Sequence, residues 1–207
     1  MAGCWHYLHD GVGIGCVADP LRQPVGDDSL PWHLEWHVCT DYFLVIATKS
    51  LLIRQAVAGE EQLVFDYIVK LADYENLRHE VEATVDDIRE SLFGTNPRVF
   101  CDLAFWNGEP AGFALWFYNY STFRGRAGIY LEDLFVDDAM RGKGIGKALL
   151  RHLAQRCVKE GLPRLQWWVL DWNAPSIEFY KSLGAVPQDE WTVFRVSGEA
   201  LQKLATT

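Results

Sequence analysis

The sequence has few of the features that mark membrane, secreted or nucleic-acid-binding proteins. Its longest apolar run, Tyr42–Thr48, is far shorter than the roughly 20 residues of a membrane-spanning helix. The first ten residues lack the basic segment of a signal peptide, and no CxxC pair occurs among the five cysteines. The net charge is −9, whereas nucleic-acid-binding proteins usually present a basic face. We therefore expect a cytoplasmic protein that binds neither nucleic acid nor membrane.

Metal-ligating and cysteine-nucleophile patterns are also missing. His33 and His37 lie four residues apart, but the string HLEWH lacks the glutamate that follows the first histidine in HExxH zinc proteases. Cys101 lies in a strand-like segment and Cys157 in a helical one, and neither has a neighbouring histidine in sequence to activate it. We therefore expect no metal site and no cysteine chemistry.

The chain does contain enough apolar residues for a sizeable core, with 49% hydrophobic residues in a length of 207. Residues 1–47 differ from the rest, because they are rich in Gly, Pro and Asp and show no helical period before Trp32. We expect an irregular N-terminal extension of unknown role there, in which Tyr42–Ala47 would add an edge strand. A single domain is expected over residues 48–207.

Strand-like and helical patterns follow one another through this domain. The expected strands are Ser50–Gln55, Val99–Trp106, Ala111–Tyr118, Ile129–Val136, Arg164–Leu170 and Trp191–Val196. The expected helices are Gly59–Tyr74, Thr84–Leu92 with Thr84 as N-cap, Ile145–Glu160, Ser176–Leu183 and Gly198–Leu204. Asn107–Gly108 is a strong hairpin signal, and Ser121–Gly128 is expected to be a loop. Antiparallel strands followed by a βαβ unit predict an α/β fold with a mixed, mostly antiparallel central sheet flanked by helices.

A compact glycine loop, Arg141–Gly146, joins the expected strand Ile129–Val136 to a helix. The unpaired N–H groups and partial positive charge of a helix N-terminus favour phosphate, and glycine lets the backbone approach it closely. The loop is not a P-loop, because Ala148 stands where that motif has Ser or Thr. Its glycine spacing also differs from the GxGxxG dinucleotide fingerprint.

The glycine loop resembles the pyrophosphate loop of the GNAT N-acetyltransferases, and four further segments extend the resemblance. They are Tyr74–Glu75, FGTNP at Phe93–Pro97, IYLEDLFV at Ile129–Val136, and VLDWNAPSIEFYKSLGA at Val169–Ala185. Residues 51–205 are thus similar to the diamine (spermidine/spermine) N-acetyltransferase family. The YST string around Ser121 and the VLDWN string resemble its thialysine N-epsilon-acetyltransferase-like branch. Residues 1–47 have no counterpart in the family.

The resemblance implies the GNAT acyl-CoA N-acyltransferase fold and direct transfer of an acetyl group to a small cationic amine in a ternary complex. Acetyl-CoA would be the co-substrate, no metal would take part, and the protein would be a homodimer with Trp191–Val196 near the contact. A primary ammonium has a pKa near 10 and must lose a proton before it attacks, and the resemblance assigns this step to Glu132. Tyr180, which is protonated at neutral pH, matches the general acid that protonates the CoA thiolate.

The resemblance also implies which residues contact each substrate. The acetyl-CoA contacts would be Leu134, Phe135, Val136, Arg141, Gly142, Lys143, Gly144, Ile145, Gly146, Lys147, Asn173, Ser176 and Lys181. The amine contacts would be Tyr74, Glu75, Asp133, Asp189 and Trp191, because carboxylates and aromatic faces suit a cation. Glu132 and Asp133 are adjacent on a strand, so we expect them to point to opposite faces of the sheet.

Two other functions are compatible with these motifs. A protein N-terminal or lysine acetyltransferase needs a broad groove for a peptide, whereas the acidic strings YE, LED and DEW favour a compact cation. A non-catalytic acyl-CoA-binding module would be expected to lack the acid or the base, yet Glu132 and Tyr180 are both present. The polyamine-specific members tend to carry an acidic residue where this chain has Ser121, which weakens the case for a long polycation. Thialysine, short diamines and polyamines all remain candidate substrates.

Overall fold

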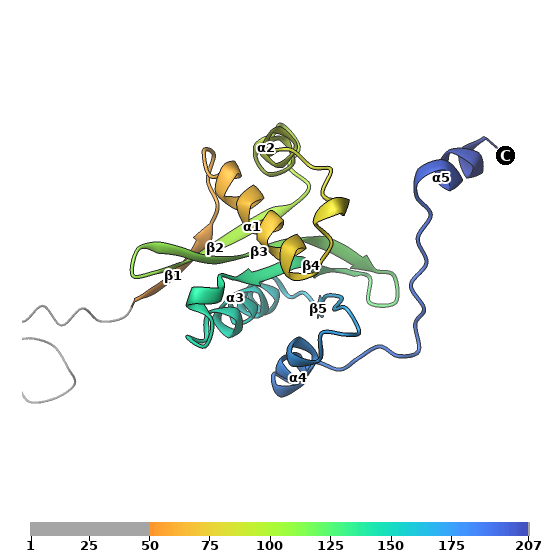
Figure 1. The fold of residues 1–207 in the computed structure, drawn as a ribbon. Coiled ribbons are helices and arrows are strands. Elements are labelled where there is room, and N and C mark those ends of the chain that lie inside the picture. The colour runs from red at the N-terminus through yellow and green to blue at the C-terminus, as the bar shows by residue number, and fades with distance from the viewer. Residues whose placement is uncertain (1–49, 207) are drawn as a thin grey trace, which may run out of the picture. The chain divides into compact units, whose positions relative to one another are not determined.

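The computed structural model describes residues 50–206, which belong to one compact unit. The extension expected over residues 1–47, with its edge strand, falls outside the described residues. Five strands form one sheet in the order β1-β2-β3-β4-β5 (Figure 1). Neighbouring strands are antiparallel from β1 to β4, and β5 runs parallel to β4. The expected mixed, mostly antiparallel sheet is therefore confirmed.

The elements largely follow the sequence patterns. The strands are β1 (Leu51–Gln55), β2 (Phe100–Trp106), β3 (Glu109–Ser121), β4 (Arg126–Val136) and β5 (Leu165–Gln166). The helices are α1 (Glu61–Tyr74), α2 (Val85–Phe93), α3 (Ile145–Glu160), α4 (Ala174–Ser182) and α5 (Gly198–Ala205), with short 3-10 helices η1 (Arg78–Glu80) and η2 (Asp138–Met140). No helix within residues 50–206 is long and apolar enough to cross a membrane.

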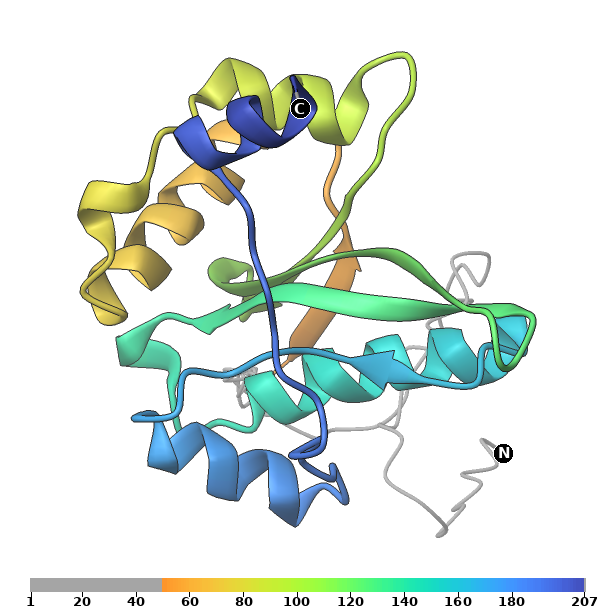
Figure 2. The same cartoon turned by 90° about the vertical axis from the view of Figure 1, so that its right-hand side faces the viewer.

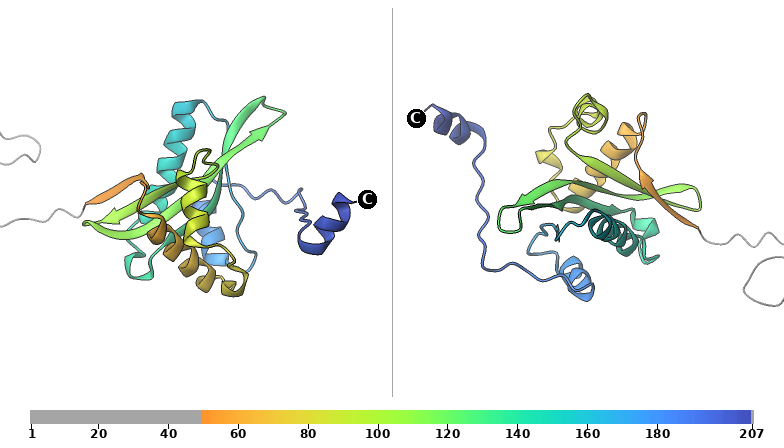
Figure 3. Two further views of the ribbon diagram at one scale, coloured as in Figure 1. Left: turned by 90° about the horizontal axis from the view of Figure 1, so that it is seen from above. Right: turned by 180° about the vertical axis from the view of Figure 1, so that it is seen from behind.

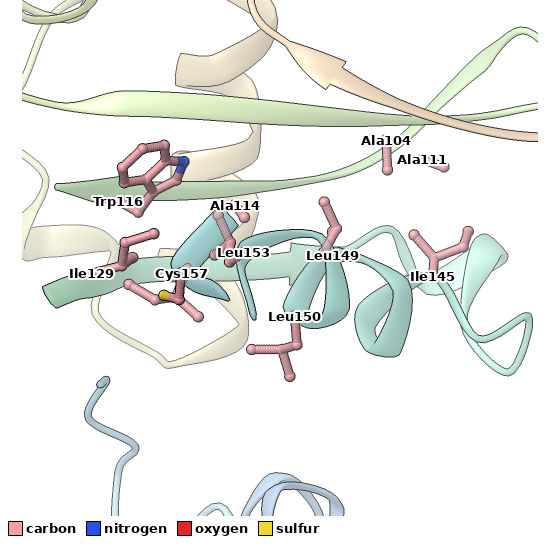
Figure 4. Close-up of a cluster of buried hydrophobic side chains, with 11 residues drawn as sticks. Ala104, Ala111, Ala114, Trp116, Ile129, Ile145, Leu149, Leu150, Leu153 and Cys157 are labelled. Carbon is pink, nitrogen blue, oxygen red and sulfur yellow. The ribbon is translucent and has the colours of Figure 1, made fainter. Parts of the chain in front are cut away.

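The sheet separates two apolar clusters. Helices α1 and α2 cover one face, and α3 and α4 lie on the other (Figures 2 and 3). On the α3 side, small strand side chains such as Ala104 and Ala114 leave room for Leu149 and Leu153 of the helix (Figure 4). Close packing of this kind holds α3, and with it the glycine loop at its N-terminus, in a fixed position against the sheet.

Local sequence signals set several element ends. Thr84 and Asp87 form a reciprocal capping box at the start of α2, as the N-cap prediction requires. Asn107 and Gly108 both have positive φ in the turn between β2 and β3, which confirms the hairpin. Gly161 ends α3 in a left-handed conformation with φ of 67°.

Three expectations about irregular and strand segments are wrong. Residues 191–196 form no strand, because no strand within residues 50–206 pairs with them. The strand expected over Arg164–Leu170 shrinks to β5, since only Leu165 and Gln166 pair with β4. The loop expected at Ser121–Gly128 is instead a tight hairpin turn, because β3 extends to Ser121 and β4 begins at Arg126.

A bulge interrupts β4 within the LED motif. Asp133 pairs with Leu115 and Leu131 pairs with Trp116, so Glu132 is an extra residue without a partner on β3. The side-chain alternation changes there: Leu131 packs in the cluster facing α3, whereas Phe135 packs in the cluster facing α1. The regular alternation from which opposite faces were expected for Glu132 and Asp133 is therefore interrupted at this pair.

Candidate active site

Several of the predicted site residues lie near the point where β4 and β5 separate. The two parallel strands pair only at Ile129–Leu165 and Tyr130–Gln166. Beyond this point β4 continues through its bulge at Glu132, while the chain after β5 leads towards α4. The C-terminal end of α1, the bulged part of β4 and helix α4 contribute the side chains described next.

Asp133 lies close enough to two other carboxylates, Glu132 and Glu75, to be affected by their charges. Glu75 caps the C-terminal end of α1, Glu132 is the exposed bulge residue, and Asp133 follows it with a less accessible side chain. Burial, followed by the negative charges of Glu132 and Glu75, raises the pKa of Asp133 to about 7. Burial also raises the pKa of Glu75. Negative groups brought together in this way are stabilised by a bound cation.

Tyr180 is on α4, and its phenol lies near Glu75 at the C-terminal end of α1. Its ring packs edge-on against Trp167, with the centroids 5.0 Å apart. Burial, then the negative charge of Glu75 and the neighbouring phenol of Tyr74, raises the pKa of Tyr180 to about 12. The phenol therefore keeps its proton at neutral pH, as a general acid must, and it shares its surroundings with Glu75 although the two residues are far apart in sequence.

The glycine loop leaves the start of α3 open to an anion. Gly142 and Gly144 have φ of 76° and 78°, a conformation that glycine adopts without strain. Gly144 is the N-cap of α3 and provides no side-chain cap. The first N–H groups of the helix are consequently available to a negatively charged ligand. Lys147 lies exposed in the first turn, and Lys143 donates to the carbonyl oxygen of Ala139 at 2.6 Å.

Arg141, at the start of this loop, is already held by protein groups. Its Nε donates to the carbonyl oxygen of Val136 at 3.2 Å, and Nη2 pairs with Asp138 at 2.8 Å. The guanidinium carbon lies 4.8 Å from the ring centre of Tyr74 and 5.7 Å from that of Phe135. These contacts fix the direction in which Arg141 presents its charge.

Asn173 connects the start of α4 with the end of α1. Its side chain is buried, and Oδ1 accepts from the backbone N–H of Ser176 and from the hydroxyl of Tyr74, both at 3.3 Å. The ring of Trp172 lies 6.1 Å from that of Tyr74. Tyr74, which the resemblance assigns to the amine, therefore contacts two residues assigned to acetyl-CoA, Arg141 and Asn173.

The remaining assigned residues divide into two groups. Leu134 and Val136 pack towards α3 and Phe135 towards α1, so this end of β4 is held from both faces. Asp189 and Trp191 lie in the exposed segment between α4 and α5, and no ring contact or hydrogen bond within residues 50–206 links them to the carboxylates. Their assignment to the amine remains a prediction. The described residues contain no group of three His, Cys, Asp or Glu arranged to hold a metal ion.

Sequence reasoning missed an aromatic surface beside the carboxylates. Tyr130 packs against Phe117 on β3, with ring centres 5.1 Å apart, and edge-on against Trp168 at 5.7 Å. Trp168 is 56% exposed, and the charge of Glu132 contributes to the raised pKa of Tyr130. The aromatic residues are visible in the sequence, but their meeting depends on the β3–β4 register and on the bulge, which carry no local signal.

Comparison with known proteins agrees with this arrangement. Residues 65–185 match the Acetyltransferase (GNAT) family. The thialysine N-epsilon-acetyltransferase of Sus scrofa is 36% identical over 167 residues, covering 75% of this chain and 98% of that protein. The L-ornithine N5-acetyltransferase of Arabidopsis thaliana is 45% identical over 94 residues, which cover 45% of this chain and 41% of that protein.

A solved structure supports the same assignment. An integron cassette protein from the mobile metagenome of V. cholerae superposes with a TM-score of 0.65 at 29% identity, covering 76% of this chain and 99% of that one. The family match spans more than half of the chain and includes the bulged strand, the glycine loop and Tyr180. The chain therefore belongs to the GNAT family of N-acetyltransferases.

Proposed function

We propose that this enzyme transfers the acetyl group of acetyl-CoA to a primary amine of a small cationic substrate, such as thialysine, a short diamine or a polyamine. The observation that carries the proposal is the grouping of Asp133 with Glu132 and Glu75, together with a partly buried, protonated Tyr180 beside Glu75. Three carboxylates suit a cation, and the phenol supplies a proton donor at the same place. The relatives named for thialysine and L-ornithine support a small amine substrate.

In this proposal Glu132 and Tyr180 handle the two proton transfers. Glu132, exposed at the bulge, assists removal of a proton from the ammonium, directly or through water. The amine nitrogen then attacks the acetyl carbon in the ternary complex, so that a C–N bond forms and the C–S bond breaks. Tyr180 gives its proton to the departing thiolate.

The raised pKa of Tyr180 links acid strength to substrate binding. After burial, the charge of Glu75 is the next cause of the shift to about 12, and a phenol with this pKa is a weak acid for a thiolate. A cation bound at Glu75 would offset that charge and lower the pKa of Tyr180. The general acid would thus become stronger when the amine is in place.

The glycine loop and the start of α4 fit the acetyl-CoA assignment. The uncapped N-terminus of α3 and the backbone of Gly142 and Gly144 suit a diphosphate, and Lys147 adds positive charge. Asn173 and Ser176 lie at the N-terminus of α4, whereas Lys181 lies in its last turn and pairs with Glu178 at 3.0 Å. No metal is required, because the proton donor and the carboxylates are side chains.

We further infer that residues 48–207 act as one cytoplasmic catalytic domain and form a homodimer. The segment after α4 exposes Trp191 and Phe194 to 73% and 90%, and α5 exposes Leu201 and Leu204 on one face. Exposed apolar side chains gathered in this way favour association. Burial of this surface between two copies is the simplest arrangement that removes it from water.

The test is thiol release from acetyl-CoA with thialysine, lysine, 1,3-diaminopropane, putrescine, spermidine and a basic peptide. We expect release with at least one small amine, and Tyr180→Phe should lower kcat by about 10²- to 10⁴-fold while acetyl-CoA still binds. Release with the peptide alone would indicate a protein acetyltransferase. Binding of acetyl-CoA without any release would indicate a non-catalytic module, and unchanged turnover in Tyr180→Phe would refute the general acid.

A further inference from the structure

Tyr74 lies between the two groups of residues that the proposed function assigns to different substrates. Its ring lies beneath the guanidinium of Arg141, its hydroxyl donates to Asn173, and the next residue is Glu75. We propose that Tyr74 is a positioning residue that couples binding of the acetyl-CoA diphosphate at Arg141 to binding of the amine at Glu75. This inference rests on the proposed function and assigns to Tyr74 a role beyond contact with the amine.

The contact with Arg141 links Tyr74 to the acetyl-CoA site. Three groups besides Tyr74 orient the guanidinium: the carbonyl oxygen of Val136, the carboxylate of Asp138 and the ring of Phe135. Two of them, Val136 and Phe135, are at the end of β4 beside the glycine loop. A diphosphate held by the loop and by Arg141 therefore keeps the guanidinium over Tyr74, and the ring is restrained in turn.

The hydrogen bond to Asn173 connects Tyr74 to the helix that carries the general acid. Asn173 is 6% exposed, and its Oδ1 serves both as the acceptor for Tyr74 and as the N-cap of α4 through Ser176. The phenol of Tyr180 is two turns further along α4, and Tyr74 contributes to its raised pKa. A change in the position of Tyr74 would therefore affect the start of α4 through Asn173 as well as the glycine loop through Arg141.

The backbone at the end of α1 transmits the restraint to Glu75. The N–H of Glu75 donates to Leu71 at 2.9 Å, and the N–H of Leu77 donates to Ala72 at 2.8 Å. Asn76 has φ of 60°, so the helix ends in a left-handed turn immediately after Glu75. Within this closed turn Glu75 moves together with Tyr74, and fixing the ring of Tyr74 fixes the carboxylate that attracts the amine.

Coupling of this kind is reciprocal and measurable at equilibrium. If CoA restrains the end of α1, the amine binds to a site that is already ordered, and the amine must strengthen CoA binding by the same factor. Couplings between two sites typically amount to about 5- to 150-fold in affinity. CoA without the acetyl group is the suitable probe, because it carries the diphosphate and cannot react.

The experiment is calorimetric titration of CoA into the full chain with and without saturating 1,3-diaminopropane. We expect the diamine to tighten CoA binding by about fivefold or more in the unaltered protein, and by a factor of about one in Tyr74→Leu. Tyr74→Phe keeps the ring beneath Arg141 and should keep most of the coupling. Phe123→Leu, at a residue 94% exposed in the β3–β4 turn, is the matched control and should behave as the unaltered protein.

Kinetics separates positioning from a general loss of folding. In Tyr74→Leu the KM for the amine at saturating acetyl-CoA should rise, whereas kcat should change much less, because Glu132 and Tyr180 remain. Absence of coupling in the unaltered protein, or undiminished coupling in Tyr74→Leu, would overturn the proposal. Equal losses in Tyr74→Phe and Tyr74→Leu would overturn the Arg141 stack as its carrier.

The binding of CoA alone is measured without an amine, so it tests this proposal independently of the proposed function. CoA alone should bind Tyr74→Leu about two- to fivefold more weakly, because the stack that orients Arg141 is lost. If no amine in the panel is acetylated, the proposed substrate class fails. The effect of Tyr74→Leu on CoA alone would still decide whether Tyr74 positions Arg141.

Discussion

At the scale of single residues, Asp133 gives the site its expected pH dependence. Its pKa of about 7 means that the carboxyl is mostly neutral below pH 7 and mostly charged above it. Attraction for a cationic amine should therefore grow as pH rises through 7. We expect kcat/KM for the amine to rise over this range, and Asp133→Asn to lower kcat/KM at pH 8 by about 10- to 100-fold.

The pH profile of Asp133→Asn is the decisive part of this measurement. The rise near pH 7 should disappear, leaving only the changes caused by deprotonation of the amine at higher pH. Glu109→Gln removes the same charge at the exposed start of β3 and should leave the profile unchanged. A rise near pH 7 that persists in Asp133→Asn would assign the titration to another group.

Individual residues also show where sequence reasoning stops. Glu132, Asp133 and Tyr180 were identified through motif resemblance. In the structure the charge of Glu75 acts on both Asp133 and Tyr180, and the charge of Glu132 acts on Asp133. The 1%-exposed side chain of Asp102 was not anticipated, because nothing in CDLAFW marks this carboxylate as interior. Its Oδ2 accepts from the indole of Trp116 at 2.7 Å, and that partner lies on the neighbouring strand.

At the scale of elements, the glycines at the two ends of α3 allow a matched comparison of two variants. Gly144 begins the helix with φ of 78° and Gly161 ends it with φ of 67°, and a Cβ at either position would meet no atom within 4 Å. Replacement by alanine costs only backbone strain in both cases. We expect Gly144→Ala and Gly161→Ala to lower the free energy of unfolding similarly, by about 1 kcal/mol each.

The two variants should differ in ligand binding. Gly144 shapes the loop that leaves the first N–H groups of α3 open to the diphosphate, whereas Gly161 is at the opposite end of the helix. CoA binding measured by calorimetry should weaken by about tenfold in Gly144→Ala and stay unchanged in Gly161→Ala. Equal CoA affinities in the two variants would refute a diphosphate site at this helix N-terminus.

Elements whose ends depend on local chemistry were predicted well, and those set by distant pairing were not. The capping box of α2, the Asn107–Gly108 turn and the terminal glycines of α3 are each written in a few adjacent residues. The length of β5 depends instead on where β4 diverges from it, which the bulge at Glu132 influences. A bulge on one strand is specified by the register of its neighbour, so its position cannot be read from the strand alone.

At the scale of the whole molecule, the segment between α4 and α5 departs from the structure that its sequence predicted. The sequence predicted a strand at Trp191–Val196, but the segment is irregular and exposed. Its apolar residues are ordinary strand formers, but no strand in the described part of the chain pairs with them. The composition of the segment therefore indicated strand-forming residues, whereas a strand also needs a neighbouring strand, which composition does not specify.

The proposed homodimer rests on this exposed segment and can be tested directly. Phe194 is 90% exposed and Leu204 of α5 is 65% exposed, so placing both in water carries a hydrophobic cost that association would relieve. We expect sedimentation equilibrium to give a dimer for the unaltered chain and a monomer for the double variant Phe194→Ser with Leu204→Ser. Phe123→Ser removes an equally exposed aromatic from the β3–β4 turn and should remain dimeric. A monomeric unaltered chain would mean that these side chains serve no self-association.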